Sequence, residues 1–233
     1  MKHSDVAVAT ITWARTSNEE SELLASLNAL ARVGLPVAVA NRAGSDGFED
    51  RLRELPGFQV CQPSSPGLVA QVQAGVAAAS RFDRRFILYV EPDKTFFFER
   101  RMRPFLDAVP DRDTLGVAIA SRTATSFATF PPMQRFAERV INRLCADLIG
   151  VAGDYSYGPF LLHRALLPIV AAMPPSLGWG WRHAAFLAAQ RERLEVLHVT
   201  GSYPCPPDQR QEDAAERTHR MRQLSENILG LVS

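Results

Sequence analysis

The stretch Phe86-Ile87-Leu88-Tyr89-Val90-Glu91-Pro92-Asp93-Lys94 decides the fold class of this 233-residue chain. Its first five residues form an apolar run of β-branched, aromatic and leucine side chains, which predicts a buried strand. The strand ends at Pro92, because proline fixes φ and donates no ladder hydrogen bond. Ligands of open α/β sheets bind just beyond the carboxyl ends of the strands, so Glu91 and Asp93 are expected to face a ligand crevice.

Two carboxylates held in a stiff turn suit a hard divalent cation. Mg²⁺ is typically bound by one or two carboxylates together with phosphate oxygens of a substrate. Glu91 and Asp93 therefore predict a site for a metal ion and a phosphorylated ligand, with Lys94 placed to support a diphosphate. The alternative is a solvated acidic turn after a strand, in which Lys94 is simply exposed.

Strand and helix patterns alternate on the amino-terminal side of this stretch. Strands are predicted at 6–13, 36–40 and 58–61. One helix is expected from Ser17, which has capping-box spacing to Glu20, up to Gly34, and another begins at Leu68. The alternation implies an α/β fold with a mostly parallel central sheet and helices on both faces.

The carboxyl-terminal side continues with further strand and helix patterns. Helices are predicted at 96–109, from 133 to about 148, at 164–172 and up to about 191. Strands are predicted at 115–120, 157–162 and 194–200, and loops at 123–132 and 173–180. We therefore expect one catalytic domain over residues 1–205.

Residues 206–233 are expected to form a C-terminal helical tail. Met221, Leu224, Ile228 and Leu231 follow one another at spacings of three, four and three, which is one face of a helix. An apolar stripe of this kind predicts packing, either on the domain itself or on a second subunit. A homodimer is thus one expectation for the assembly.

Composition excludes several classes of partner. The 26 basic and 25 acidic residues leave a net charge of +1, so no global field favours nucleic acid. No apolar run approaches the roughly 18–20 residues of a membrane span, and the first residues lead into a strand rather than a secretory apolar region. We therefore expect a cytoplasmic protein with no membrane span, in which the three cysteines are reduced and bind no metal.

The order of the motifs resembles a glycosyltransferase of the GT-A fold, within the family 2 class of nucleotide-diphospho-sugar transferases. The segment Asn41 to Gly47 resembles the family's loop after the second strand, and Gly67 to Gly75 resembles its glycine-led helix start. Glu91-Pro92-Asp93 resembles its Asp-x-Asp motif. Ser121-Arg122 and the run from Asp154 through Gly158 and Phe160 to Arg164 resemble its later motifs, so the similarity spans nearly the whole chain.

The resemblance implies a metal-dependent glycosyltransferase that moves a sugar from a nucleoside-diphosphate sugar donor to a hydroxyl acceptor, with Mg²⁺ or Mn²⁺ as cofactor. The resemblance and the chemistry of individual residues together give four sets of candidate site residues. These are metal ligands Glu91, Asp93 and His198; nucleotide or donor contacts Thr12, Asn41, Arg42, Asp46, Gln71 and Lys94; catalytic groups Asp154 and His183; and acceptor contacts Arg122, Trp179 and Trp181.

Several of these residues have a plain structural alternative. His183 could act as a base or merely close a helix end, and His198 could complete the metal shell or pack in a strand. Trp179 and Trp181 flank glycines in a way that suits stacking on sugar faces, although tryptophans also fill cores. Asp46 could bind a ligand or hold a tight turn.

Two positions depart from the family pattern. Asn41 and Arg42 stand where paired aspartates are common, and the guanidinium of Arg42 could engage a phosphate bidentately. The loop before the late helix carries Arg182 and His183 instead of an acidic residue.

The sequence also bears on three other functions. A sugar nucleotidyltransferase is expected to have a glycine-rich basic loop after its first strand, but Ala14 to Asn18 contains no glycine. A degenerate GT-A domain that binds a nucleotide or sugar without turnover remains a second candidate. A dehydrogenase is disfavoured, because no G-x-G-x-x-G motif follows a strand.

Overall fold

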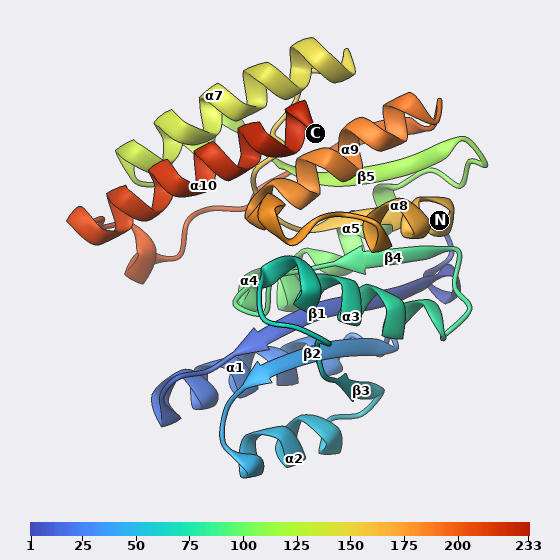
Figure 1. Ribbon diagram of the computed structural model, residues 1–233, viewed down its shortest axis with the longest axis vertical. Helices are drawn as coiled ribbons and strands as arrows, with labels where there is room; N and C mark the ends of the chain where they lie inside the picture. The colour runs from blue at the N-terminus through green and yellow to red at the C-terminus, as the bar shows by residue number, and fades with distance from the viewer.

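A seven-stranded sheet runs through the protein, whose computed structural model describes residues 1–233 (Figure 1). The strands lie in the order β3-β2-β1-β4-β6-β5-β7, and β6 alone is antiparallel to its neighbours. They are β1 Val6–Trp13, β2 Val37–Ala43, β3 Phe58–Cys61, β4 Phe86–Tyr89, β5 Leu115–Arg122, β6 Phe160–His163 and β7 Glu195–Gly201. The predicted α/β class with a mostly parallel sheet is confirmed.

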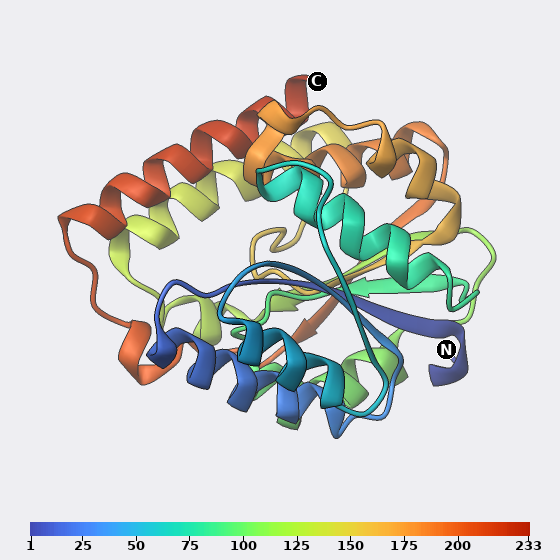
Figure 2. The same ribbon diagram turned by 60° about the horizontal axis from the view of Figure 1, so that its bottom comes forward.

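Helices cover both faces of the sheet, as Figure 2 shows. One face carries α1 Ser17–Ala31, α2 Asp46–Glu54, α4 Thr95–Arg100 and α5 Met102–Ala108. The other carries α3 Leu68–Ser80, α7 Pro132–Ile149, α8 Leu167–Ala171, α9 Trp181–Arg191 and α10 Ala214–Val232. The period of two along β1 explains the two layers, because Val6 and Val8 join one core cluster while Ala7 and Ala9 join the other.

Short elements connect these helices and strands. The four-residue helix α6 spans Ala124–Phe127. The 3₁₀ turns are η1 His3–Asp5, η2 Arg164–Leu166, η3 Pro175–Gly180 and η4 Pro207–Gln209. Two segments predicted as loops, 123–132 and 173–180, therefore contain a short helix, and the cap of α6 explains one of them, since the Thr123 side chain accepts a hydrogen bond from the Ser126 backbone N–H.

Several predicted boundaries move. The expected loop 41–47 is mostly regular, because β2 continues to Ala43 and α2 begins at Asp46. Ser45 caps α2 by accepting from the Phe48 N–H, and the fully buried Phe48 anchors the helix to the core. In α1 the cap is Thr16 rather than Ser17.

The single helix predicted at 96–109 is two helices. Arg101 separates α4 from α5 with φ −125°, outside the helical region. Phe97 and Phe105, on either side of the break, pack in the core with ring centroids 5.8 Å apart. The break thus lets aromatic side chains of both short helices face the same core.

The C-terminal helix α10 packs on α7, α9 and η3, and Figure 1 shows it beside α7. Of the predicted apolar stripe, Leu231 is buried and Leu224 and Ile228 are half-buried, but Met221 is exposed. The prediction for Met221 is wrong, because the buried residues of α10, namely Asn227, Gly230 and Leu231, all lie near the end of the helix. None of the helices is long and apolar enough to cross a bilayer.

Two glycines let α10 and η3 meet backbone to backbone. A Cβ built on Gly230 would lie 2.0 Å from the Gly180 carbonyl oxygen, and one built on Gly180 would lie 2.0 Å from the Glu226 carbonyl oxygen. We therefore expect Gly230→Ala to lower the free energy of unfolding by roughly 1–3 kcal/mol through overpacking, measured by urea denaturation. Gly47→Ala is the matched control, because nothing lies within 4 Å of its Cβ position. Equal stability of the two variants would contradict the close approach.

Candidate active site

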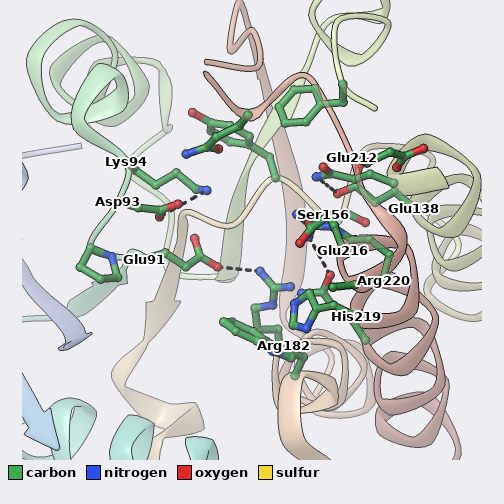
Figure 3. A pocket seen from close by; sticks show the side chains of 18 of the residues that line it. Glu91, Asp93, Lys94, Glu138, Ser156, Arg182, Glu212, Glu216, His219 and Arg220 are labelled. Atoms are coloured by element: carbon green, nitrogen blue, oxygen red, sulfur yellow. Dashed lines mark hydrogen bonds and ion pairs between the residues drawn. The ribbon is translucent and has the colours of Figure 1, made fainter. Parts of the chain in front are cut away.

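A cavity of about 1250 Å³ opens at the carboxyl ends of β1, β4 and β5. Ile11 and Trp13 of β1 and the turn from Glu91 to Lys94 form one part of its lining. Side chains of the C-terminal segment close the opposite side, where Figure 3 shows Glu216, His219 and Arg220 facing the turn. The volume exceeds the roughly 300–1,000 Å³ of most small-ligand sites, so the cavity has room for two substrates.

The acidic turn faces this cavity as predicted from its place after β4, and its carboxylates are paired with cations of the chain (Figure 3). Arg182 Nη1 donates to Glu91 Oε1 at 2.8 Å, while Glu91 Oε2 is buried with no hydrogen-bond partner. Lys94 Nζ lies 3.5 Å from Asp93 Oδ1. Burial alone would lower the pKa of Lys94, but Asp93 and Glu91 outweigh it and raise that pKa above its usual value. The negative charges of Glu91 and Asp93 are therefore neutralised by Arg182 and Lys94.

Gly158 shapes the position of Glu91. Its φ of +127° is a conformation that glycine adopts readily, and a Cβ there would lie 2.0 Å from Glu91 Oε2. The Glu91 carboxylate thus rests directly against the backbone at Gly158. This contact explains why a glycine stands four residues after Asp154 in the motif.

Arg122 lines the cavity, as predicted, and is the centre of a buried ionic network there. Its Nε donates to Asp154 Oδ2 at 2.6 Å, and its Nη2 donates to Asp154 Oδ1 at 2.9 Å and Glu138 Oε2 at 2.7 Å. The guanidinium also lies 4.3 Å from the ring centroid of Phe130. Burial alone would raise the pKa of Asp154, but the Arg122 charge and hydrogen bonds hold it below its usual range.

This network changes the expected roles of two residues. Asp154 also accepts hydrogen bonds from Asn142 and from the backbone of Arg122 and Ser156. A carboxylate with a depressed pKa and this many donors is a poor proton acceptor, so Asp154 is not free to act as the predicted base. Arg122 likewise has its Nε and Nη2 donors occupied within the chain, which leaves only Nη1 for an acceptor.

Two further predicted residues lie in the core instead of the cavity. His183 is fully buried beside Phe186, and burial lowers its pKa well below the ordinary value, so it cannot reach an acceptor as a base. Trp181 is also fully buried and packs edge-on against Tyr89 with ring centroids 4.8 Å apart. Trp179 does line the cavity, and its ring lies under the Arg182 guanidinium at 5.3 Å.

Three of the predicted nucleotide contacts come together, but as a buried cluster. Thr12 Oγ1 donates to Asn41 Oδ1 at 3.0 Å, and Gln71 Nε2 donates to the Thr12 and Ala40 carbonyl oxygens at 2.6 and 2.9 Å. Asn41 Nδ2 in turn donates to Glu49 Oε2 at 3.0 Å. These hydrogen bonds tie α3 to the ends of β1 and β2, and none of the three predicted side chains lines the cavity.

Arg42 and Asp46 are exposed and do not line the cavity. The Arg42 guanidinium is 4.9 Å from the ring centroid of Trp13. Trp13 itself is 53% exposed and does line the cavity. Arg42 therefore contacts a residue of the cavity lining without lining the cavity itself.

His198 does not line the cavity that the acidic turn faces, so the structure does not bring it to the predicted metal site. It packs edge-on against Tyr155 with centroids 4.4 Å apart and against Gly153, and both ring nitrogens are buried without partners. Among the groups of His, Cys, Asp and Glu in the structure, no three are close enough to hold a metal ion by themselves.

The buried His198 ring predicts acid-sensitive stability. Burial lowers its pKa to about 4, only partly opposed by Asp154. In the unfolded chain His198 takes up a proton near pH 6.5, whereas in the folded chain it does so only near pH 4. The free energy of unfolding therefore falls as the pH drops through this window, by on the order of 3 kcal/mol. His198→Gln should show a smaller loss between pH 6.5 and 4 in urea denaturation; an unchanged loss would assign the acid sensitivity to other groups.

Several residues line the cavity that the sequence did not single out for a role, among them Trp13, Glu138, Arg182 and His219. His219 makes no hydrogen bond or ion pair within the chain. A signal existed for Arg182, because it stands where the family pattern has an acidic residue. No local pattern marks His219, which reaches the cavity because α10 packs on α7, α9 and η3.

This fold and cavity define the class of the protein as an α/β protein with a GT-A-like fold. No protein-family model matches the chain, and no curated protein sequence matches it. Among solved structures, it is similar to glucosyl-3-phosphoglycerate synthase from Mycobacterium tuberculosis in complex with Mn²⁺, UDP and glucosyl-3-phosphoglycerate. That likeness has a TM-score of 0.66 and 15% identity, and covers 97% of this chain and 79% of the synthase.

Two more structures show the same likeness. The synthase in complex with Mn²⁺, UDP-glucose and glycerol 3-phosphate matches with a TM-score of 0.67 and 14% identity, over 97% of this chain and 79% of that one. A mycobacterial protein matches with a TM-score of 0.68 and 16% identity, over 97% and 74% of the two chains. The comparisons establish the GT-A-like fold that the sequence motifs predicted.

Proposed function

We propose that the chain is a metal-dependent glycosyltransferase that moves a sugar from a nucleoside-diphosphate donor to a hydroxyl acceptor. One observation carries the proposal: Glu91 and Asp93 follow β4 and face a 1250 Å³ cavity at the strand ends of a GT-A-like sheet. Ligands of such sheets bind at this edge. The similar synthase is described with Mn²⁺ and UDP-glucose, which are the cofactor and donor type that this arrangement suits.

The residues present fit a divalent cation that a phosphate completes. Glu91 Oε2 is a buried carboxylate oxygen without a partner, and Asp93 lies two residues away on the same cavity wall. Two carboxylates with phosphate oxygens are the usual set for Mg²⁺, and Mn²⁺ accepts the same oxygen ligands. When bound, such an ion supplies Lewis-acid stabilisation of the leaving diphosphate.

The remaining residues of the cavity position the substrates. Lys94 and Arg182 place positive charge beside the carboxylates, where the diphosphate charge develops as the sugar leaves. Trp13 and Trp179 offer aromatic faces to the base and the sugar. The Arg122 network holds the wall behind them in a fixed geometry.

We propose that His219 is the general base that takes the proton of the acceptor hydroxyl. It is a cavity-lining imidazole with no partner within the chain. General-base catalysis is typically worth about 10²–10⁴-fold in rate. His219→Gln should therefore lower kcat of sugar transfer by about 10²-fold while leaving the Kd for the nucleoside diphosphate within about twofold, measured by calorimetry. Unchanged kcat would remove His219 from the reaction.

The acceptor we propose is a small anionic hydroxyl compound of the phosphoglycerate or glycerol phosphate type. The similar synthase is described with phosphoglyceric acid and with glycerol 3-phosphate. The cavity lining here is mostly polar and contains Arg15, Arg182 and Arg220 as well as carboxylates.

The test is a transfer assay with a panel of nucleoside-diphosphate sugars, each with Mn²⁺ or Mg²⁺ and with either of these acceptors. The expected result is release of nucleoside diphosphate that depends on both metal and acceptor. If a nucleotide binds but none of the donors in the panel releases nucleoside diphosphate, the result would favour the second candidate, a GT-A-like domain that binds without turnover. The observation that favours that candidate is the engagement of Asp154 by Arg122.

A further inference from the structure

Arg182 is the second residue of α9 and is only 4% exposed, yet it lines the cavity. Its Nη1 donates to Glu91 Oε1 at 2.8 Å, its guanidinium lies 5.3 Å from the Trp179 ring centroid, and its Nε is buried without a partner. One edge of the guanidinium is therefore committed to Glu91, while another donor remains unused. A planar guanidinium of this kind can bind a phosphate through two parallel hydrogen bonds.

Arg182 and a metal ion compete for the same carboxylate. Glu91 Oε1 is occupied by Arg182, and Oε2 is buried against Gly158. An ion therefore gains full access to Glu91 only when the guanidinium withdraws. Asp93 is less restricted, because its side chain is 48% exposed and its partner Lys94 lies 3.5 Å away.

We propose that Arg182 is a positioning residue that exchanges Glu91 for the donor diphosphate, so that metal binding depends on diphosphate binding. This inference rests on the proposed function and adds to it the order in which the site is filled. A diphosphate carries more negative charge than one carboxylate, so its arrival draws the guanidinium from Glu91 and exposes the carboxylate to the cation. Linkage makes the effect reciprocal: the metal raises the affinity for the diphosphate by the same factor.

The test measures Mn²⁺ affinity by electron paramagnetic resonance, with and without saturating UDP or, in parallel, GDP. In the wild-type chain the nucleotide should tighten Mn²⁺ binding by at least about tenfold. Arg182→Gln should bind Mn²⁺ alone at least about fivefold more tightly than wild type, with the added effect of the nucleotide reduced. Arg139→Gln is the matched control, because it removes the same charge from an exposed residue of α7 outside the cavity, and its Mn²⁺ affinity should equal that of wild type.

Three outcomes overturn the inference. If Arg182→Gln and Arg139→Gln bind free Mn²⁺ with the same affinity, Arg182 does not compete with the metal, although the proposed function stands as long as nucleotide and Mn²⁺ bind. If the wild-type chain binds neither nucleotide nor Mn²⁺, the proposed function and the inference both fail. The wild-type titration decides the coupling even if the variant folds poorly, since equal Mn²⁺ affinity with and without bound nucleotide also overturns it.

Discussion

Asp93→Asn is expected to lower the rate of sugar transfer by about 10²–10³-fold, the usual loss when one stabilising group is removed from a charge-developing centre. The substitution keeps the shape of the side chain and removes the charge that faces the cavity. Lys94 then loses its partner, and a divalent cation loses its most accessible carboxylate.

The fold should survive this change. Asp93 is half exposed, and ion pairs of this kind contribute only about 0–1 kcal/mol to stability. The measurement is the initial rate of transfer across a Mn²⁺ titration, with the thermal unfolding midpoint recorded in parallel. Asp50→Asn is the control, since Asp50 is an exposed acid paired with Arg53 on α2. A rate and metal dependence equal to those of the control would mean that the acidic turn is not the donor site.

Arg122→Met is expected to lower the free energy of unfolding by about 3–5 kcal/mol, because it removes one side of a buried ionic network. Methionine keeps much of the side-chain volume against Phe130 but leaves Asp154 and Glu138 without their common cation. Each uncompensated carboxylate then carries a desolvation penalty in its charged form. The measurement is urea denaturation at neutral pH.

The pH dependence distinguishes this loss from simple repacking. In the wild-type chain the pKa of Asp154 is depressed, so its contribution to stability is present at neutral pH and is lost as pH falls through the folded pKa. In Arg122→Met, burial raises that pKa, so stability is lost as pH rises above the unfolded value. Adding Asp154→Asn should restore part of the stability at pH 7. If neither the pH profile nor the double variant behaves this way, the network is not what stabilises this wall.

Local patterns predicted the layers of this fold well. The strands at 6–13 and 58–61 have the predicted bounds, because their apolar runs are bounded by clear turn residues. The helix at Leu68 also begins where predicted, at the residue after Gly67. Boundaries failed where a cap or a core contact decides them, as at Ser45, whose side chain starts α2 inside a predicted loop.

The candidate site residues were predicted correctly only in part. The predicted residues that do line the cavity hold positions set locally by strand ends and loops: Glu91, Asp93, Lys94, Arg122 and Trp179. Trp181 lies two residues from Trp179 yet is fully buried, since one turn of 3₁₀ and α-helix aims the two rings in different directions. Spacing along the sequence cannot show which of two nearby aromatic side chains faces a core.

By itself, the sequence determined the α/β class, the mostly parallel sheet and the acidic turn after β4, because hydrophobic periodicity and proline act over a few residues. Only the tertiary structure decided what surrounds that turn. Arg182 reaches Glu91 across 91 positions of sequence, and His219 faces the cavity from α10. The charge of Glu91 in the acidic turn is therefore balanced by an arginine that is distant in the sequence. This contact depends on how α9 packs beside the sheet, and no local sequence pattern predicts it.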